Sequence, residues 1–433
     1  MSLNQFSGGG TWEKLSQVAV MGAVHDSRER RPHPKCLENT RVELLKFIYG
    51  LLDNREKSQL FWLHGTAGVG KSAVAFTVAE RMKSLKVEER SPNEKRLGGT
   101  FFFSREHTKR RTTGYFFSTL AYQLARNFPS IREEVNCALR ENPALLHRNM
   151  SLRDQMEALF LRPLRRLLFR LRECPPLVFV IDALDECTSE TLDAKKQKKK
   201  QKKTFDKSTA ESELADLISL LGQALREPDL PVIHILLTSR SEDHIRKAIQ
   251  REEMEGVATI ISLDGADVDN DIHIFLQHCF RDLESRHPDF PQPSGYQLTQ
   301  LARRAGRRFI VASTMVKFID ERARGKDPRD RLQLMLELTS NLLLGTEVYE
   351  LYDRILFTCA DPKRAYLHLS VVAALADPLP ILQISKLLGP DEGSDVETTL
   401  VQLRSIVDIP TDSSLPYEIS PHLTHYSRIH VSA

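Results

Sequence analysis

One eight-residue segment constrains this chain more than any other feature. It reads Gly65-Thr66-Ala67-Gly68-Val69-Gly70-Lys71-Ser72. The segment fits the phosphate-loop pattern G-x-x-x-x-G-K-[ST] at every position. The apolar run 60–63 before it has the length of a buried strand, and residues 73–82 after it can continue as a helix. We therefore predict that a strand, a loop and a helix follow one another in the order that such a loop requires.

The residue types of this loop suit a polyphosphate ligand. Glycines let main-chain N–H groups approach phosphate oxygens closely, and the following helix directs its partial positive charge at the same anion. Lys71 adds a full charge near the β- and γ-phosphates, and the Ser72 hydroxyl can ligate Mg²⁺. We predict that all eight residues bind a nucleoside triphosphate, ATP or GTP, together with Mg²⁺. A chance glycine-rich turn is the alternative.

The net charge of +3 hides an uneven distribution. Residues 195–203 read KKQKKKQKK and contain seven lysines, so the remainder of the chain sums to 3 − 7 = −4. The remainder offers no basic face, and we expect no nucleic-acid partner. Like charges at this density repel one another, so we interpret the run as a solvated inserted loop, with a nuclear-localisation or nucleic-acid segment as the alternative.

The cysteines and the apolar runs indicate the compartment. The six cysteines are scattered without a C-x-x-C pair, which favours a reducing environment. The first ten residues lack the apolar core of a signal peptide, and the longest apolar run, 309–319, is too short to span a bilayer. We predict a cytoplasmic protein without a membrane partner.

Four further apolar runs read as buried strands and alternate with helical patterns. They cover residues 98–104, 177–181, 232–237 and 258–263. With the strand before the phosphate loop they predict an α/β fold: a five-stranded parallel sheet flanked by helices. Beyond residue 264 the patterns are mainly helical.

Polar residues end two of these strands at the edge where open α/β sheets bind ligands. Asp182 is placed to assist Ser72 in holding Mg²⁺. Asp185 and Glu186 follow it and can hold or deprotonate an attacking water. Arg240 follows the apolar run 232–237, at the tip of that strand, and can neutralise the γ-phosphate. The alternatives are a solvated loop for the two acidic residues and a surface arginine for Arg240.

These motifs together resemble a known family. The phosphate loop, the strand ending in Asp-Ala-Leu-Asp-Glu (182–186) and the later Leu-Leu-Thr-Ser-Arg (236–240) are similar to the NACHT class of STAND nucleotide triphosphatases, above all to fungal proteins related to animal NOD-like receptors. The small residue Ala183 after the first aspartate is typical of that class. The segment 36–41 and the stretch 306–312 add to the likeness, the latter in an altered register.

The resemblance implies four parts. Residues 1–35 would be a disordered or linker leader, and 36–263 would be the P-loop NTPase core, with the lysine-rich loop at 190–210. Residues 264–345 would be a helical subdomain, and 346–433 a winged-helix-like subdomain. The segment 421–426 departs from the usual histidine-containing pattern, so we expect this last part to be shortened. Neither an effector module nor sensor repeats can be found in the sequence.

The resemblance also implies a function, which is a nucleotide-dependent signalling switch with slow hydrolysis and self-association on activation. The expected setting is fungal innate immunity or heterokaryon-incompatibility-like signalling. Two alternatives stay open from the residues. One is a mechanical or remodelling ATPase, which would show steady, substrate-stimulated turnover. The other is a non-hydrolysing interaction fragment that nucleotide only stabilises.

Overall fold

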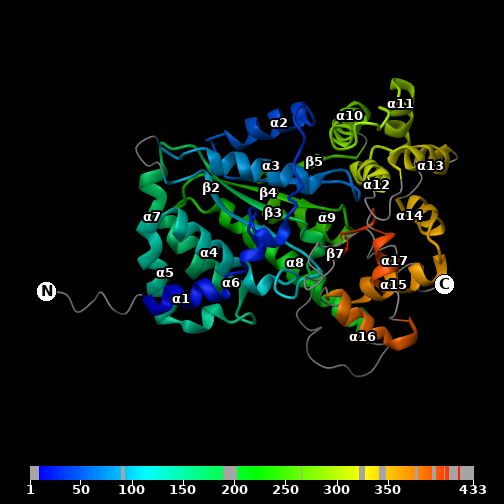
Figure 1. Cartoon of the computed structure of the whole chain (residues 1–433). Coiled ribbons are helices and arrows are strands. Elements are labelled where there is room, and N and C mark those ends of the chain that lie inside the picture. The colour runs from blue at the N-terminus through cyan, green and yellow to red at the C-terminus, as the bar shows by residue number, and fades with distance from the viewer. Residues whose placement is uncertain are drawn as a thin grey trace. The chain divides into compact units, whose positions relative to one another are not determined.

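The computed structural model is shown in Figure 1. It describes residues 9–88, 93–188, 202–264, 266–320, 327–340, 348–375, 379–392, 396–403, 405–408 and 418–419. The chain divides into two compact units. The first comprises Met1–Cys36, Val42–Thr66 and Lys71–Asp264, and the second comprises Leu37–Arg41, Ala67–Gly70 and Gly265–Ala433.

The first unit is built on a parallel sheet of five strands in the order β2-β3-β4-β1-β5. The strands are β1 (Gln59–His64), β2 (Leu97–Phe102), β3 (Leu177–Asp182), β4 (Ile233–Ser239) and β5 (Ala258–Ser262). The strand that precedes the phosphate loop, β1, pairs with β4 and β5. The strand that ends in Asp182, β3, lies between β2 and β4. The predicted fold class is therefore confirmed.

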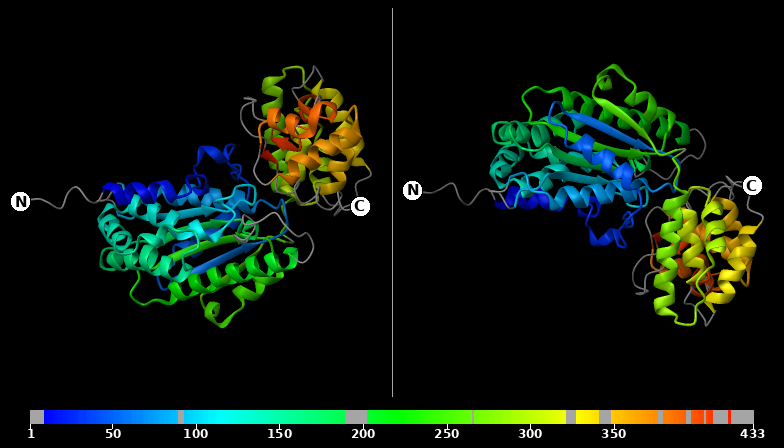
Figure 2. Two further views of the ribbon diagram at one scale, coloured as in Figure 1. Left: turned by 90° about the horizontal axis from the view of Figure 1, so that it is seen from below. Right: turned by 90° about the horizontal axis from the view of Figure 1, so that it is seen from above.

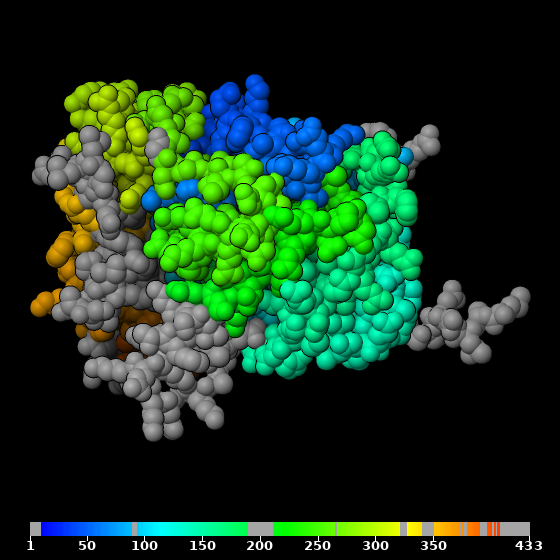
Figure 3. All heavy atoms as spheres, turned by 180° about the vertical axis from the view of Figure 1, so that it is seen from behind, coloured from blue at the N-terminus to red at the C-terminus, as the bar shows by residue number. Residues whose placement is uncertain are grey.

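Helices cover both faces of this sheet, as Figure 2 shows. They are α2 (Val42–Leu52), α3 (Lys71–Ser84), α4 (Phe116–Asn127), α5 (Arg132–Glu141), α6 (Leu152–Met156), α7 (Arg162–Leu171), α8 (Lys202–Arg226) and α9 (Asp243–Ile249), with a π-helical turn Glu157–Leu161 between α6 and α7. Right-handed crossovers place α3 on one face and the helices between β2 and β5 on the other. Figure 3 shows the outer surface of α8 and α9 (green) beside α5–α7 (teal).

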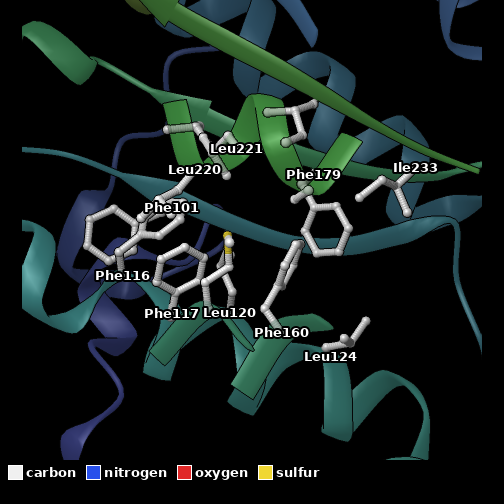
Figure 4. Close-up of a cluster of buried hydrophobic side chains, with 14 of the residues drawn as sticks. Phe101, Phe116, Phe117, Leu120, Leu124, Phe160, Phe179, Leu220, Leu221 and Ile233 are labelled. Atoms are coloured by element: carbon white, nitrogen blue, oxygen red, sulfur yellow. The ribbon is translucent and has the colours of Figure 1, made fainter. Parts of the chain in front are cut away.

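The core of the first unit lies on the second of these faces, where aromatic rings from strands and helices interlock (Figure 4). Phe179 of β3 meets the ring of Phe160 at 5.1 Å between centroids. Phe101 of β2 meets Phe116 of α4 at 5.3 Å. All four rings are almost fully buried. Burial of such side chains is the main stabilising contribution to a domain of this kind, at about 1.5–3 kcal/mol each.

In the part of the chain that the structure describes, no strand pairs with the outer edge of β2, and side-chain amides of α4 bond backbone groups in and just before this strand. Gln123 accepts from the Thr100 N–H at 3.0 Å and donates to the Thr100 carbonyl at 2.7 Å. One helical turn later, Asn127 accepts from the Lys95 N–H and donates to its carbonyl, at 2.9 and 2.8 Å. The two amides thus reproduce the pairing that a neighbouring strand would give.

The prediction of a disordered leader over residues 1–35 is wrong from residue 9 onward. Gly9–Val18 forms helix α1, and Trp12 stacks on Tyr122 of α4 with 5.0 Å between ring centroids. Residues 19–36 then cross β2 and α3 as a folded segment that we call the N-terminal strap. Its Val20 N–H donates to the buried Thr119 hydroxyl at 3.0 Å. The apolar residues of the strap have no periodic spacing, so they leave no signal in the sequence. Val20 and Ala23 nevertheless pack into the core of the first unit.

The predicted lysine-rich loop at 190–210 is too long at its C-terminal end. Residues 189–201 lie outside the described residues, and α8 already begins at Lys202. Leu217 and Leu221 of this helix are buried in the core of the first unit. Residues 202–210, which the sequence assigns to the loop, therefore belong to the helix.

The second unit is mainly helical. It contains α10 (Asp269–Arg286), α11 (Gly295–Arg304), α12 (Phe309–Ile319), α13 (Pro328–Ser340), α14 (Val348–Phe357), α15 (Pro362–Ala374), α16 (Ile381–Glu392) and α17 (Val396–Val401), and the antiparallel pair β6 (Val407–Asp408) and β7 (Glu418–Ile419). Both predicted C-terminal subdomains share one cluster of buried apolar residues, from Val268 to Val407. The predicted histidine-containing segment 421–426 lies outside the described residues. Within the described parts of both units, we find no helix with the length and apolarity that crossing a membrane requires.

Candidate nucleotide-binding site

The predicted phosphate loop lies between the end of β1 at His64 and the start of α3 at Lys71. Two of its residues, Gly68 and Gly70, have φ angles of +80° and +96°. Such angles are readily adopted only by glycine. The loop therefore has the backbone shape that its glycine spacing predicts, and it joins the strand to the N-terminus of a fourteen-residue helix.

Charged side chains hold the start of this loop. The Lys71 ammonium donates to the carbonyls of Gly65 and Thr66, at 2.8 Å each. The Thr66 N–H donates to the Asp264 carboxylate at 2.8 Å. Burial lowers the pKa of Lys71, and the charge of Asp185 opposes this effect. Lys71 is thus directed along the loop, where it can meet an anion.

The middle of the loop, residues 67–70, groups with the second unit. The Ile310 N–H donates to the Gly68 carbonyl at 3.3 Å. A Cβ atom on Gly68 would lie 2.1 Å from Cγ2 of Ile310, so this glycine is required for close approach as well as for its φ angle. Arg41 donates to the Val69 carbonyl at 2.6 Å, and its N–H donates to the Asp271 carboxylate at 3.1 Å.

Asp182 ends β3 and is almost completely buried. Its carboxylate accepts a 2.5 Å hydrogen bond from the Thr238 hydroxyl, and the nearby Ser72 hydroxyl also favours its charged form. Burial raises the pKa of Asp182, against these two hydroxyls and the positive charges of Arg30 and Lys71. The structure thus brings together the two residues predicted to hold a metal ion, Ser72 and Asp182. Their oxygen donors are the kind that Mg²⁺ prefers.

The next residue, Ala183, has a left-handed backbone with φ of +55°. Its N–H donates to the Thr238 hydroxyl at 3.1 Å, and the same hydroxyl donates to Asp182. A left-handed conformation disfavours large or branched side chains. The small residue that the resemblance noted at this position therefore has a local physical reason, which is the tight turn that follows the strand.

Asp185 lies between two arginines. Its Oδ1 accepts from the Arg240 N–H at 3.0 Å, and its Oδ2 lies 3.2 Å from Nε of Arg240. The Arg105 guanidinium is 4.0 Å from the same Oδ2 and donates to the Asp185 carbonyl at 3.0 Å. Both carboxylate oxygens are therefore engaged with cationic residues. Asp185 is placed to orient Arg240 rather than to accept a proton from water.

Glu186 is also buried, but it has fewer partners. Its Oε2 accepts the Arg105 N–H at 3.3 Å. Burial, together with the charge of Asp185, raises the pKa of Glu186 to about 7, against the opposing charge of Arg105. Near neutral pH this carboxyl group is therefore present in both protonation states, as a general base requires. Of the two predicted catalytic carboxylates, Glu186 fits the role better.

The polar residues at the end of β4 have different hydrogen-bond partners. Thr238 faces Asp182, whereas the Ser239 hydroxyl accepts from Nε1 of Trp62 at 2.8 Å and donates to the Arg240 carbonyl at 2.8 Å. Both hydroxyls are buried. Arg240 is the residue of this tip that keeps part of its side chain exposed, at 21%.

Two residues of this site escaped prediction from the sequence. Arg105 follows β2 in a charged stretch without any motif, and its partner Asp185 lies 80 residues away. Arg30 belongs to the N-terminal strap, which the sequence predicts as a leader. No pattern within either segment indicates that it reaches the carboxyl edge of the sheet.

Comparisons with known proteins agree with the site at a coarse level. Residues 48–240, somewhat under half of the chain, match the family model described as "Nephrocystin 3, N-terminal". This stretch contains the phosphate loop, Asp182, Asp185, Glu186 and Arg240. A search of curated proteins gives no match.

Three solved structures are similar over most of the chain. The Walker-type ATPase paby2304 of Pyrococcus abyssi is 18% identical, with a TM-score of 0.39 over 92% of this chain and 99% of its own. The ORC2 protein of Aeropyrum pernix, in ADPNP–ADP complexes, is 12% identical, with a TM-score of 0.41 over 95% and 100%. Drosophila ORC bound to DNA is 12% identical, with a TM-score of 0.31 over 99% and 93%. Similarity at this level carries no argument about function, so the proposal below depends on the site itself.

Proposed function

We propose that this chain is a nucleotide-dependent signalling switch of the NACHT type, which binds ATP or GTP with Mg²⁺ and hydrolyses it slowly. The observation that carries the proposal is the convergence of separate elements on the carboxyl edge of one sheet. Lys71 and Ser72 come from the start of α3, Asp182 from the end of β3, and Arg240 from the end of β4. Electrostatic interactions connect Lys71 and Ser72 with Asp182, and Asp185 connects Lys71 with Arg240, to which it is ion-paired.

Each residue has a role that follows from its position. Main-chain N–H groups of residues 65–72 bind phosphate oxygens, and Lys71 adds a unit charge at the same place. Ser72 and Asp182 would hold Mg²⁺, which when bound neutralises phosphate charge. Arg240, oriented by Asp185, would face the terminal phosphate.

The contacts of the acidic pair support slow hydrolysis. Glu186 accepts a proton only in its ionised form, and with a pKa of about 7 it is ionised in roughly half of the molecules at neutral pH. Asp185 is committed to Arg240 and Arg105. A site whose single proposed base is only partly ionised at neutral pH suits a protein that keeps its nucleotide for a long time.

Nucleotide-controlled self-association, in fungal immunity or heterokaryon-incompatibility-like signalling, completes the proposal. It is supported by the motifs at 65–72, 182–186 and 236–240. A cytoplasmic location is supported by the six cysteines, none of which forms a disulfide in the structure.

The decisive test is calorimetric titration of nucleotide with Mg²⁺ into the Lys71→Ala protein. We expect binding to be lost, because both the phosphate charge partner and the contacts of the loop disappear. Lys46→Ala is the matched control, since Lys46 is an exposed lysine on α2. Binding by Lys71→Ala at the wild-type affinity would refute the site.

The engagement of Asp185 favours a second candidate, in which nucleotide stabilises the protein without being hydrolysed. The two candidates separate in one set of measurements. A switch should turn over slowly and should change its mass between ADP and a non-hydrolysable ATP analogue in size-exclusion chromatography with light scattering. A stabilised fragment should show a higher melting temperature with nucleotide, no turnover and no change of mass.

A further inference from the structure

The N-terminal strap, residues 19–36, contributes an arginine to the face of the sheet that carries Asp182. The guanidinium carbon of Arg30 lies 3.6 Å above the centroid of the Phe102 ring. Phe102 and Asp182 are register partners on β2 and β3, and side chains of partners on neighbouring strands point to the same face. Arg30 therefore lies beside the predicted metal-binding carboxylate, on its own side of the sheet.

Several contacts fix Arg30 in this place. Its Nη1 donates to the His25 carbonyl at 3.0 Å, and the His25 N–H donates in turn to the Thr100 hydroxyl of β2 at 2.9 Å. One residue earlier, Glu29 lies 3.2 Å from Nη1 of Arg110, whose Nε donates to the Phe102 carbonyl at 3.2 Å. The Arg30 guanidinium thus contacts the Phe102 ring and the His25 carbonyl, and the strap that carries it is hydrogen-bonded to β2.

The strap is anchored at its other end on α3, the helix that begins with Lys71. The Cys36 N–H donates to the Thr77 hydroxyl at 3.0 Å, and Lys35 forms a 2.7 Å ion pair with Glu80. The His33 ring stacks on Phe76 at 4.9 Å between centroids. The strap therefore spans from the helix after the phosphate loop to the edge strand, a rigid path that sets where Arg30 lies.

We propose that Arg30 is a positioning residue of the nucleotide site, a built-in counter-charge for Asp182 that lets the site hold a nucleoside diphosphate with little dependence on Mg²⁺. The inference rests on the function proposed above. A fixed positive charge beside Asp182 attracts the phosphates but repels a divalent cation. Two such charges, those of Arg30 and Lys71, act on Asp182, and burial strengthens their effect by excluding water.

The test compares the dissociation constant of ADP in EDTA with that in saturating Mg²⁺, for wild type and for Arg30→Gln. We expect the dissociation constant in EDTA, divided by that in Mg²⁺, to be about tenfold higher in Arg30→Gln than in wild type. A unit charge within about 10 Å, at an effective dielectric constant of about 20, changes affinity by about that factor. Arg28→Gln is the matched control, because Arg28 lies on the same turn and is exposed. Its ratio should equal that of wild type.

The conservative variant separates charge from packing. Arg30→Lys keeps the charge and should restore most of the wild-type ratio, even if its melting temperature falls. An unchanged ratio in Arg30→Gln would mean that Arg30 only packs the strap, and a ratio in Arg30→Lys as high as in Arg30→Gln would mean that charge is not the cause. Either result overturns the inference. Failure of wild type to bind ADP in both buffers would instead overturn the proposed function.

Discussion

Replacing Glu186 with glutamine should stabilise the first unit above neutral pH while removing the proposed proton acceptor. Burial raises the pKa of Glu186 from 4.5 to about 7 in the folded protein. Between these two values the folded state binds more protons than the unfolded state, so stability falls as the pH rises. Below about pH 4.5 the group is protonated in both states and imposes no penalty.

The size of the penalty follows from the pKa difference. The interval between 4.5 and about 7, at about 1.4 kcal/mol for each pKa unit, amounts to about 3 kcal/mol at pH 8. Glutamine keeps the shape of the side chain and carries no charge, so it escapes this penalty. It also loses the attraction of Glu186 to Arg105, so we expect a net gain of about 1–3 kcal/mol at pH 8 and almost none at pH 5.

Urea unfolding followed by tryptophan fluorescence measures this effect in the correct unit. The chain has two tryptophans, Trp12 and Trp62, and both belong to the first unit. The exposed Glu56 provides the control Glu56→Gln, which should leave the unfolding midpoint unchanged at both pH values. A difference between wild type and Glu186→Gln that is the same at pH 5 and pH 8, or a less stable variant at pH 8, would refute the reasoning.

Three further substitutions test the geometry around the loop. Gly68→Ala should lower nucleotide affinity at least about tenfold in calorimetry, and an unchanged affinity would contradict this. Gly68→Ala plus Ile310→Ala should recover part of the affinity, because the clash with the Ile310 side chain is relieved while the positive φ stays. Ala183→Gly should raise the unfolding free energy by up to about 1 kcal/mol by removing left-handed strain, and any loss of stability would count against it. Trp62→Phe should cost about 1–3 kcal/mol by circular dichroism, because the buried Ser239 hydroxyl loses its donor; the matching double substitution with Ser239→Ala should recover part of this cost.

The strands and the loop could be predicted because each carries its information locally. Five buried apolar runs and one glycine pattern suffice for the sheet, the crossovers and the position of Lys71. Asp182 was predictable because the last residue of a parallel strand lies at the ligand-binding edge whatever the rest of the chain does.

The electrostatics of the site could not be predicted in the same way. The choice of Glu186 over Asp185 as base depends on Arg105 and Arg240, which come from two other strand ends. Arg30 depends on a strap whose apolar residues have no period and whose anchors are polar contacts to distant elements. Such pairings are decided by tertiary packing, which leaves no trace in a short stretch of sequence.

The amides that close the edge of β2 have a consequence for how copies of this protein can join. An open edge strand is a template on which another chain can extend the sheet, and it is a common route to unwanted polymers. Gln123 and Asn127 already occupy the backbone groups of Thr100 and Lys95, so a second chain would have to displace both amides before it could add a strand. Extension of the sheet at this edge would therefore have to begin with the release of both amides, and their loss is expected to leave these backbone groups open to another chain.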